Sequence, residues 1–374
     1  MKIRVIKANR GFWTDLFEEK FSRFCFVENT VKSFEDSVKN SKSIFWWLSQ
    51  RRIFDKIGYF QIIKVQNSDA DMYFSYNRFL DTDRPYILAL ENPLALVHYR
   101  PARARSVLGK KRLRKAFQNN IKAIVCISEA CEKTLSKYFV VPKDLRVVQI
   151  YPFIKDRISL EKLNKKTEQK PLECLFISSM FFLKGGRELL EVIKRNRWDL
   201  DKVHFSIITS LKYLNQNVID EIQSLKSVSL YDFKFSKKDL NAFYEKANIL
   251  INPTRKDSFS LVTLEALMYG CAFISTDMYA ISEMVEDGFN GYLIQPAIKY
   301  WNNDYTKNEL SKDKLLALES DYCQAEVVDF ISDKINYFLN NKEELIRMQY
   351  NSFDRANTKF SEKSIKTKWE EVVK

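Results

Sequence analysis

The chain has 374 residues, of which 45% are hydrophobic and 14% aromatic, and it carries a formal net charge of +13. This composition excludes a disordered chain, and the length suits two domains that each bury a core. Only two His and six scattered Cys are present. We therefore expect reduced core thiols, and neither a disulfide framework nor a metal site.

No apolar run reaches the roughly 18 residues of a membrane-spanning helix, and residues 1–6 enter a strand-like pattern without the apolar core of a signal peptide. The expected location is therefore the cytoplasm.

The first half of the chain alternates strand-like and helix-like patterns, which predicts an N-terminal domain over residues 1–155. The strands are expected near residues 3–8, 60–65, 72–75, 86–90, 123–127 and 146–150. Alternation of this kind is typical of a parallel sheet with helical crossovers.

One stretch of this half is strongly basic, because no acidic residue lies between Glu91 and Glu129. The positive residues there are Arg100, Arg103, Arg105, Lys110, Lys111, Arg112, Arg114, Lys115 and Lys122. Such a segment suits an anionic membrane surface or nucleic acid, and it is also compatible with a merely solvated face. The membrane surface is favoured, because Val107, Leu108, Leu113, Phe117 and Ile121 supply an apolar stripe beside the charges.

A second interfacial element is possible at the aromatic run Phe45-Trp46-Trp47-Leu48, which Arg51 and Arg52 follow. An ordinary core role suits these aromatic residues equally well.

After a charged spacer at residues 155–170, a second alternation predicts another domain over residues 171–355. Its strands are expected near residues 173–177, 203–208, 228–231, 248–252, 272–275 and 291–294. The fold class is therefore α/β, with two doubly wound domains in tandem and a functional site in the cleft between them. Residues from Tyr322 onward are expected to form helices alone.

The segment Asp257-Ser-Phe-Ser-Leu-Val-Thr-Leu-Glu265 carries most of the chemical information. It follows the strand-like residues 249–251 and a polar turn, so a helix is expected to begin near Phe259. The free N–H groups at a helix N-terminus bind phosphate, and a carboxylate accepts hydrogen bonds from sugar hydroxyls. The pattern therefore predicts a nucleotide-sugar site.

Each of these residues also has a plain structural interpretation. Asp257 suits a helix N-cap, and Glu265 suits a solvated helix position, although it lies among leucines where an unpaired carboxylate is costly. Lys184, before Gly185 and Gly186, suits an exposed turn. The pairs Asp69-Ala-Asp71 and Asp81-Thr-Asp83 imitate a metal-binding motif, but they are expected by chance among 48 acidic residues.

Residues 174–293 resemble the donor domain of GT-B glycosyltransferases, in particular the retaining family 4 with its two Glu residues separated by seven positions. The residues that carry the resemblance are Leu175 to Gly185, Asp257 to Glu265, and Ala272 to Gly291. Residues 360–369 are similar to the family's closing helix, which implies that residues 356–374 return to the N-terminal domain. The N-terminal half matches weakly, best at residues 124–130 and 145–148.

The resemblance implies roles for individual residues. Glu265 would hold the ribose, Asp257 would lie beside the transferred sugar, and Lys184 would contact the diphosphate. The donor-binding set implied in addition is Ser258, Phe259, Ser260, Leu261, Ser179 and Gly185. The family's retaining reaction, in which the leaving diphosphate helps to accept the proton, implies neither a metal ion nor a cofactor beyond the donor substrate.

The sequence departs from the family pattern at several positions. Asp257 is one methylene shorter than the usual Glu, and Ser179 stands where an Arg normally assists the lysine, a loss that Arg187 or Arg255 would have to offset. Glu91 stands where many members carry a His on the catalytic side, so we expect it to contact the sugar or the acceptor. On the acceptor or membrane side we expect His98, Arg103, Lys110, Lys111, Arg112 and Arg114.

The function implied is a cytoplasmic glycosyltransferase, peripheral at the inner face of the membrane, that acts in polysaccharide, lipopolysaccharide or capsule biosynthesis. It would transfer a sugar from a nucleoside diphosphate to a lipid-linked or surface-polysaccharide acceptor with retention of configuration. Two alternatives stay open: a GT-B-like protein that binds nucleotide sugars without catalysis, and a basic protein that binds nucleic acid.

Overall fold

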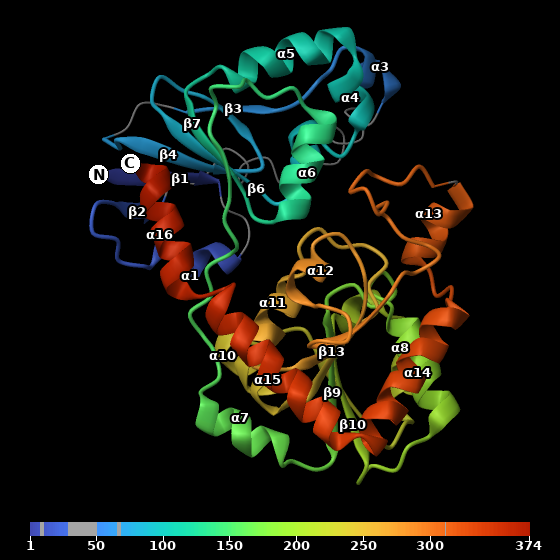
Figure 1. Ribbon diagram of the computed structural model, residues 1–374. Helices are drawn as coiled ribbons and strands as arrows, with labels where there is room; N and C mark the ends of the chain where they lie inside the picture. The colour runs from blue at the N-terminus through green and yellow to red at the C-terminus, as the bar shows by residue number, and fades with distance from the viewer. Residues whose placement is uncertain (8–10, 29–50, 66–68, 311) are drawn as a thin grey trace. The chain divides into compact units, whose positions relative to one another are not determined.

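The computed structural model describes residues 1–7, 11–28, 51–65, 69–310 and 312–374. The aromatic run at residues 45–48 lies outside these ranges. Backbone contacts divide the chain into two compact units (Figure 1). Unit 1 comprises Met1–Phe153 with Glu362–Lys374, and unit 2 comprises Ile154–Ser361.

Unit 1 is built on a six-stranded parallel sheet in the order β2-β1-β4-β6-β7-β8. Its strands are β1 (Lys2–Lys7), β2 (Cys25–Glu28), β4 (Met72–Tyr76), β6 (Tyr86–Leu90), β7 (Ile121–Cys126) and β8 (Val147–Gln149). A separate parallel pair is formed by β3 (Ile62–Lys64) and β5 (Phe79–Asp81).

The helices of unit 1 connect these strands. They are η1 (Gly11–Trp13), α1 (Thr14–Phe17), α3 (Arg52–Lys56), η2 (Pro93–Val97), α4 (Pro101–Arg105), α5 (Val107–Phe117), α6 (Glu129–Tyr138) and α16 (Glu362–Val373). The last of them packs here because Trp369 is buried against aromatic residues of the N-terminal segment, with its ring centre 6.3 Å from that of Trp13 and 6.2 Å from that of Phe74. Burial of such large rings stabilises the contact strongly.

Unit 2 contains a second six-stranded parallel sheet, in the order β11-β10-β9-β12-β13-β14. Its strands are β9 (Leu172–Ser178), β10 (Val203–Thr209), β11 (Val228–Asp232), β12 (Ile249–Asn252), β13 (Ala272–Thr276) and β14 (Gly291–Ile294). The two expected parallel sheets are thus confirmed. Strands β9, β12 and β13 are buried along their whole length, as expected for a sheet covered on both faces.

The helices of unit 2 cover both faces of this sheet. They are α7 (Leu160–Thr167), α8 (Gly186–Asn196), η3 (Leu211–Tyr213), α9 (Gln216–Gln223), α10 (Lys237–Lys246), α11 (Leu261–Met268), α12 (Ile281–Met284), α13 (Lys312–Glu319), α14 (Ala325–Asn340) and α15 (Lys342–Thr358). Figure 1 shows α8 beside α14 on one side of the sheet, with α10, α11 and α15 on the other.

The sequence located the strands of unit 2 more completely than those of unit 1. All six expected strands of unit 2 are present. In unit 1 the expected strand at residues 60–65 forms the small pair with β5 instead of joining the main sheet, and β2 and β5 were not expected. β2 (Cys-Phe-Val-Glu) and β5 (Phe-Leu-Asp) each end in a carboxylate after two or three apolar residues, so neither offers a sustained apolar run or an alternating pattern.

Candidate functional site

The candidate site lies in unit 2, at the carboxyl ends of the neighbouring strands β9 and β12. The chain adds β10 and β11 on one side of β9 and then crosses to β12 on the other side. Ligands of open parallel sheets bind outside the carboxyl ends of the strands at such a switch point. Lys184 lies in the turn that follows β9, and Asp257 in the loop that follows β12.

Two glycines allow the turn after β9 to approach the β12 loop closely. Gly185 has a φ of +79°, and a Cβ at this position would lie 2.2 Å from the carbonyl oxygen of Pro253. A Cβ on Gly186 would meet the Phe181 ring at 2.4 Å. A larger residue at either position would clash. Gly185 therefore lets the turn that carries Lys184 pack against the β12 loop, and Gly186 makes room for the Phe181 ring within the same turn.

Lys184 and Asp257 form an ion pair, with 2.5 Å between the Lys184 Nζ and the Asp257 Oδ2. The same ammonium donates to the carbonyl oxygen of Lys256 at 2.8 Å. Both side chains of the pair are about one fifth exposed, so the pair remains accessible to a ligand. The structure thus brings together the two residues that the sequence suggested for catalysis in this domain.

Asp257 also organises the loop that leads into α11, although the N-cap of α11 is Ser260 and not Asp257 as its alternative interpretation expected. Its Oδ1 accepts hydrogen bonds from the backbone N–H groups of Ser258 at 2.9 Å and Ser260 at 3.1 Å. Trp301 donates from its indole N–H to the Asp257 carbonyl oxygen at 2.6 Å. One carboxylate therefore holds the loop before α11 and takes part in the ion pair with Lys184.

The remaining residues of the loop divide into internal and ligand-accessible groups. Phe259 and Ser260 are buried, and the Ser260 hydroxyl bonds to the Asn252 amide at 3.0 Å and to Thr263 at 2.8 Å. Ser258 and Leu261 are half-buried. Among the described residues, the backbone N–H groups of Leu261 and Val262 have no hydrogen-bond partner. These donors at the start of α11 suit an anionic group.

Glu265 lies on α11, one helical turn after Leu261, and a tyrosine holds its carboxylate. Tyr244, on α10, donates its hydroxyl to the Glu265 Oε2 at 2.7 Å. Burial and the negative charge of Glu265 raise the pKa of Tyr244 well above its ordinary value, so the phenol keeps its proton and remains a donor. Glu265 itself is half-buried.

The missing arginine at position 179 is not replaced by Arg255. Ser179 is exposed. The Arg255 side chain is completely buried and donates from Nε and Nη2 to the Glu188 Oε1 at 3.1 and 2.7 Å. Arg187 pairs with Glu221 at 3.2 Å and with Asp321 at 3.8 Å. Arg255 therefore shapes the loop from within and does not contact a ligand.

Sequence reasoning missed Tyr244 and Trp301. Tyr244 is 21 positions before Glu265, and Trp301 is 44 positions after Asp257. Neither belongs to a local motif, so the only signal was the presence of a large amphipathic aromatic residue that needs a polar partner when buried.

Glu91 and His98 lie in unit 1, at the carboxyl end of β6. The Tyr76 hydroxyl donates to the Glu91 carboxylate, and the Glu91 backbone N–H donates to the Asn77 side chain at 3.1 Å. His98 ends η2 in a left-handed conformation with a φ of 56°, and its ring stacks on Tyr59 at 6.3 Å between ring centres. Both residues are thus positioned by aromatic neighbours.

Arg103 does not lie on the acceptor or membrane side, so this expectation was wrong. Its side chain is completely buried, and its Nε donates to the Asp55 Oδ1 at 3.0 Å, so it faces the interior of unit 1. Burial lowers the pKa of Arg103. Its role is to join α4 to α3.

The other basic residues of this group lie on the outside of α5. Lys110, Lys111, Arg112 and Arg114 are exposed. The expected apolar stripe is only partly at the surface: Leu113 and Phe117 are buried in unit 1, whereas Val107 is 84% and Leu108 51% exposed. The first turn of α5 therefore presents two apolar side chains beside a row of cations.

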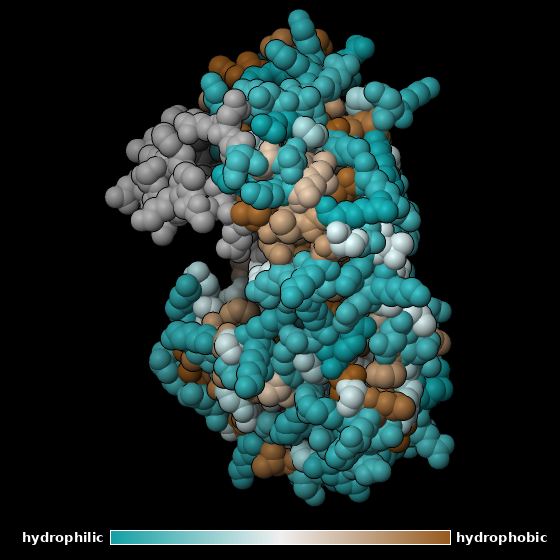
Figure 2. Space-filling view, turned by 90° about the vertical axis from the view of Figure 1, so that its left-hand side faces the viewer, coloured by the Kyte–Doolittle hydropathy of each residue, from teal (hydrophilic) through white to brown (hydrophobic). Residues whose placement is uncertain are grey.

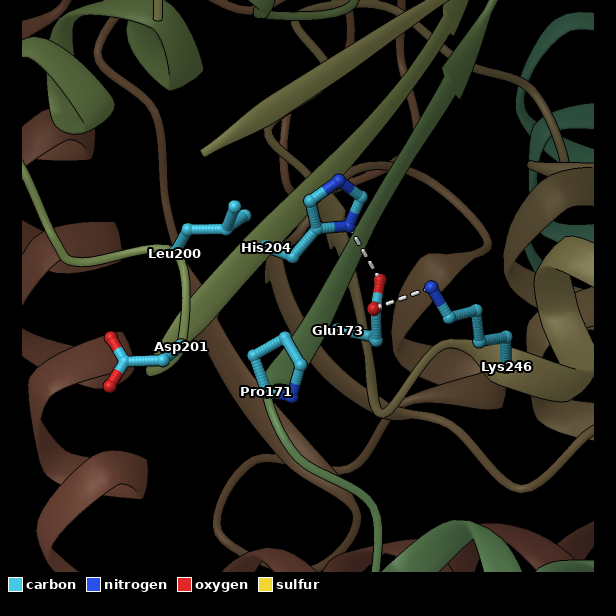
Figure 3. A pocket seen from close by; sticks show the side chains of 6 residues that line it. All are labelled: Pro171, Glu173, Leu200, Asp201, His204 and Lys246. Carbon is cyan, nitrogen blue, oxygen red and sulfur yellow. Dashed lines mark hydrogen bonds and ion pairs between the residues drawn. The ribbon is translucent and has the colours of Figure 1, made fainter. Parts of the chain in front are cut away.

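An open surface depression of about 590 Å³ lies at the opposite end of the unit 2 sheet (Figure 3). His204 and Lys246 point toward Glu173 there, with His204 Nδ1 2.8 Å and Lys246 Nζ 2.6 Å from its carboxylate oxygens. Hydrogen bonds from these two side chains hold the pKa of Glu173 below its usual range despite its burial. The cluster ties β9, β10 and α10 together, so His204 has a structural role.

In the ranges given above, no cluster of three or more His, Cys, Asp or Glu has an arrangement that would hold a metal ion. Within the same ranges, none of the helices combines the length and the apolar character needed to cross a membrane.

Part of unit 2, including the candidate site, is similar in sequence to a known protein family. Residues 171–300 match the sequence model of the family described as Glycosyl transferases group 1. A Klebsiella pneumoniae protein, described as an uncharacterized 41.2 kDa protein in the cps region, is 31% identical over 136 residues. That alignment spans 36% of each chain, so it covers about a third of the relative's length.

Solved structures share the fold over a longer stretch. Anabaena Alr3699/HepE, solved in complex with UDP, superposes with a TM-score of 0.63 at 13% identity, covering 100% of this chain and 99% of that one. A mutant of TarM from S. aureus, solved in complex with fondaparinux, alpha-GlcNAc-glycerol and UDP, gives a TM-score of 0.53 at 16% identity, covering 80% of this chain and 55% of that one. The fold is GT-B, and the resemblance to group 1 glycosyltransferases is confirmed for residues 171–300.

Proposed function

We propose that this protein transfers a sugar from a nucleoside diphosphate to a glycan acceptor. The basis is the similarity of residues 171–300 to group 1 glycosyltransferases and the GT-B fold. The observation that carries the proposal is the ion pair of Lys184 and Asp257 at the switch point of the unit 2 sheet, beside the unpartnered N–H groups of α11. This arrangement lies inside the segment that matches the family. The UDP complex of the Anabaena protein supports a nucleotide-sugar donor.

Each group then has a defined task. The diphosphate binds at the N-terminus of α11 and takes the Lys184 ammonium as its counter-ion. Asp257 accepts hydrogen bonds from hydroxyls of the transferred sugar, and Glu265, held by Tyr244, accepts them from the ribose.

The reaction breaks the bond between the anomeric carbon and the diphosphate oxygen, and it forms the bond to the acceptor oxygen on the same face of the sugar. The acceptor hydroxyl gives its proton to the leaving diphosphate. Lys184 and the helix N-terminus stabilise the negative charge as it develops. We propose retention of configuration and turnover without a metal ion as the finer features of this reaction.

The proposed function is tested by incubating the full chain with UDP-, GDP-, ADP- and dTDP-sugars, with EDTA present, and recording the anomeric protons by NMR. Consumption of one donor with an α-configured product from an α-configured donor supports the proposal. Turnover that requires added Mg²⁺, or an inverted product, would overturn the metal-independent or retaining part. Tight donor binding without any turnover would favour the non-catalytic alternative, which Ser179 and the shortened Asp257 motivate.

The acceptor is proposed to be lipid-linked or surface polysaccharide, with the protein peripheral at the inner face of the membrane. The cps-region description of the Klebsiella relative and the glycan-type ligands of the TarM complex support a polysaccharide pathway. On the face shown in Figure 2, hydrophilic residues predominate and apolar residues form small patches. We propose that attraction to a membrane depends mainly on charge, through the exposed cations of α5, beside which Val107 and Leu108 are exposed apolar side chains.

Replacing Lys110, Lys111 and Arg114 together by Gln is expected to weaken binding to phosphatidylglycerol vesicles about 100-fold, because each surface cation contributes about 1 kcal/mol. The measurement is vesicle co-sedimentation at low and high salt. A matched control replaces Lys202, Lys212 and Lys234, three exposed lysines of unit 2, and removes the same charge. Equal weakening by both triple variants, or equal binding to neutral vesicles, would contradict a specific membrane surface on α5.

A further inference from the structure

Lys256 is a half-buried cation next to the ion pair of Lys184 and Asp257. Its ammonium lies 4.3 Å from the centre of the Tyr300 ring, and its carbonyl oxygen accepts the hydrogen bond from Lys184. Within the part of the chain that the structure describes, no carboxylate oxygen lies within 4.0 Å of the Lys256 ammonium and no hydrogen-bond acceptor contacts it.

This environment is unfavourable for an isolated cation. Burial lowers the pKa of Lys256, the more distant Glu319 opposes this effect, and the positive charge of Lys184 adds to it. A half-buried ammonium with the positive charge of Lys184 nearby and no carboxylate oxygen within 4.0 Å costs free energy, unless an anion offsets the charge. The contact with the Tyr300 ring supplies only part of the missing stabilisation.

The residues around the switch point carry an excess of positive charge, which such an anion would offset. Lys184, Lys256 and Lys307, whose ammonium lies 5.2 Å from the centre of the same Tyr300 ring, contribute three positive charges, and Asp257 and Glu319 contribute two negative charges. These five residues therefore have a net charge of +1 before a ligand binds. The unpartnered N–H groups of Leu261 and Val262 point to the same ligand chemistry. Arg255 is excluded as a further cation by its complete burial with Glu188, and position 179 holds an uncharged serine.

We propose that Lys256 is the second cation for the diphosphate of the donor, and that it takes over the charge that Ser179 does not provide. The inference rests on the proposed function, because it assumes that the anion is the diphosphate of a nucleotide sugar. On diphosphate binding, the Lys256 ammonium gains a full counter-ion while retaining its contact with Tyr300. Lys184 and Lys256 then share the charge that develops on the leaving group.

Binding of uridine, UDP and inorganic pyrophosphate to the full chain tests this inference by calorimetry. Lys256→Met is expected to weaken binding of UDP and pyrophosphate about tenfold or more, the effect of one charge-assisted contact, and to leave uridine binding unchanged. Lys256→Arg should retain most of the affinity, which separates loss of charge from disturbed folding. Lys334→Met is the matched control, since the Lys334 ammonium also lies on a tyrosine ring, 3.9 Å from the centre of Tyr292.

The outcomes separate this inference from the proposed function. Unchanged UDP and pyrophosphate affinity in Lys256→Met, with wild-type protein that turns over a nucleotide sugar, would overturn the role of Lys256 alone. The same role would be overturned if the loss appeared only with a donor whose sugar carries a carboxylate. Lys256-dependent pyrophosphate binding without turnover of any donor would uphold the anion site and overturn the proposed function. A wild-type protein that binds neither pyrophosphate nor any of UDP, GDP, ADP and dTDP would overturn both.

Discussion

Replacing Lys184 by Met is expected to lower kcat about 100- to 1000-fold, the loss that follows when one preorganised charge is removed from a transition state. Lys184 is the only residue among those described that forms an ion pair with Asp257. The substitution therefore removes charge from the leaving diphosphate and also releases the carboxylate beside the sugar. Steady-state kinetics with the preferred donor measures the effect, and KM should change much less than kcat if Lys184 acts mainly in the transition state.

The control for this variant is Lys162→Met. Lys162 forms a comparable ion pair, 2.9 Å from the Glu245 carboxylate, but it lies on α7 and is about half exposed. Its replacement should leave kcat within about twofold, because exposed pairs contribute little. A Lys184→Met enzyme with nearly normal kcat would show that the diphosphate departs elsewhere.

Replacing Arg255 by Met is expected to lower the free energy of unfolding by about 3–5 kcal/mol, because it leaves the Glu188 carboxylate buried without its partner. Both side chains are completely buried. The guanidinium also donates to the carbonyl oxygens of Ala317 at 2.8 Å and Ser320 at 3.2 Å. Urea unfolding followed by circular dichroism measures the change.

A double variant isolates the ion pair from the rest of this effect. Glu188→Gln combined with Arg255→Met should be less destabilised than the sum of the two single variants, because no buried charge is left unpaired. Arg195→Met is the surface control, since Arg195 pairs with Asp329 while both side chains are about half exposed or more. Additive single effects, or an Arg255→Met protein as stable as Arg195→Met, would contradict the assigned role.

The sequence predicted unit 2 well because its central strands contain unbroken apolar runs. Each of β9, β12 and β13 is a run of buried residues followed by a turn, and such runs are the clearest strand signal. Unit 1 was harder to predict. Its β2 is short, and the apolar stripe of α5 belongs mainly to the core at Leu113 and Phe117. A stripe that meets a core and one that meets a membrane have the same spacing in sequence.

The candidate site was predictable only where its residues lie in one motif. Asp257 and Glu265 are eight positions apart, and Lys184 precedes a pair of glycines that the close packing against Pro253 requires. The environment of Arg255 could not be predicted from the sequence, because a single charged residue in a polar loop does not indicate whether it faces solvent or an internal carboxylate. Its pairing with Glu188, 67 positions away, depends on tertiary packing.

The central claim is that unit 2 binds a nucleotide sugar through Glu265, and calorimetric titration of the full chain with UDP-, GDP-, ADP- and dTDP-sugars tests it most directly. The wild-type protein is expected to bind one of these ligands, and Glu265→Gln to bind it about 10- to 100-fold more weakly, because hydrogen bonds to a charged acceptor are lost. Glu245→Gln, a control on α10 with an exposed ion pair, should bind normally. Absence of binding to every UDP-, GDP-, ADP- and dTDP-sugar, or equal binding by wild type and Glu265→Gln, would contradict the claim.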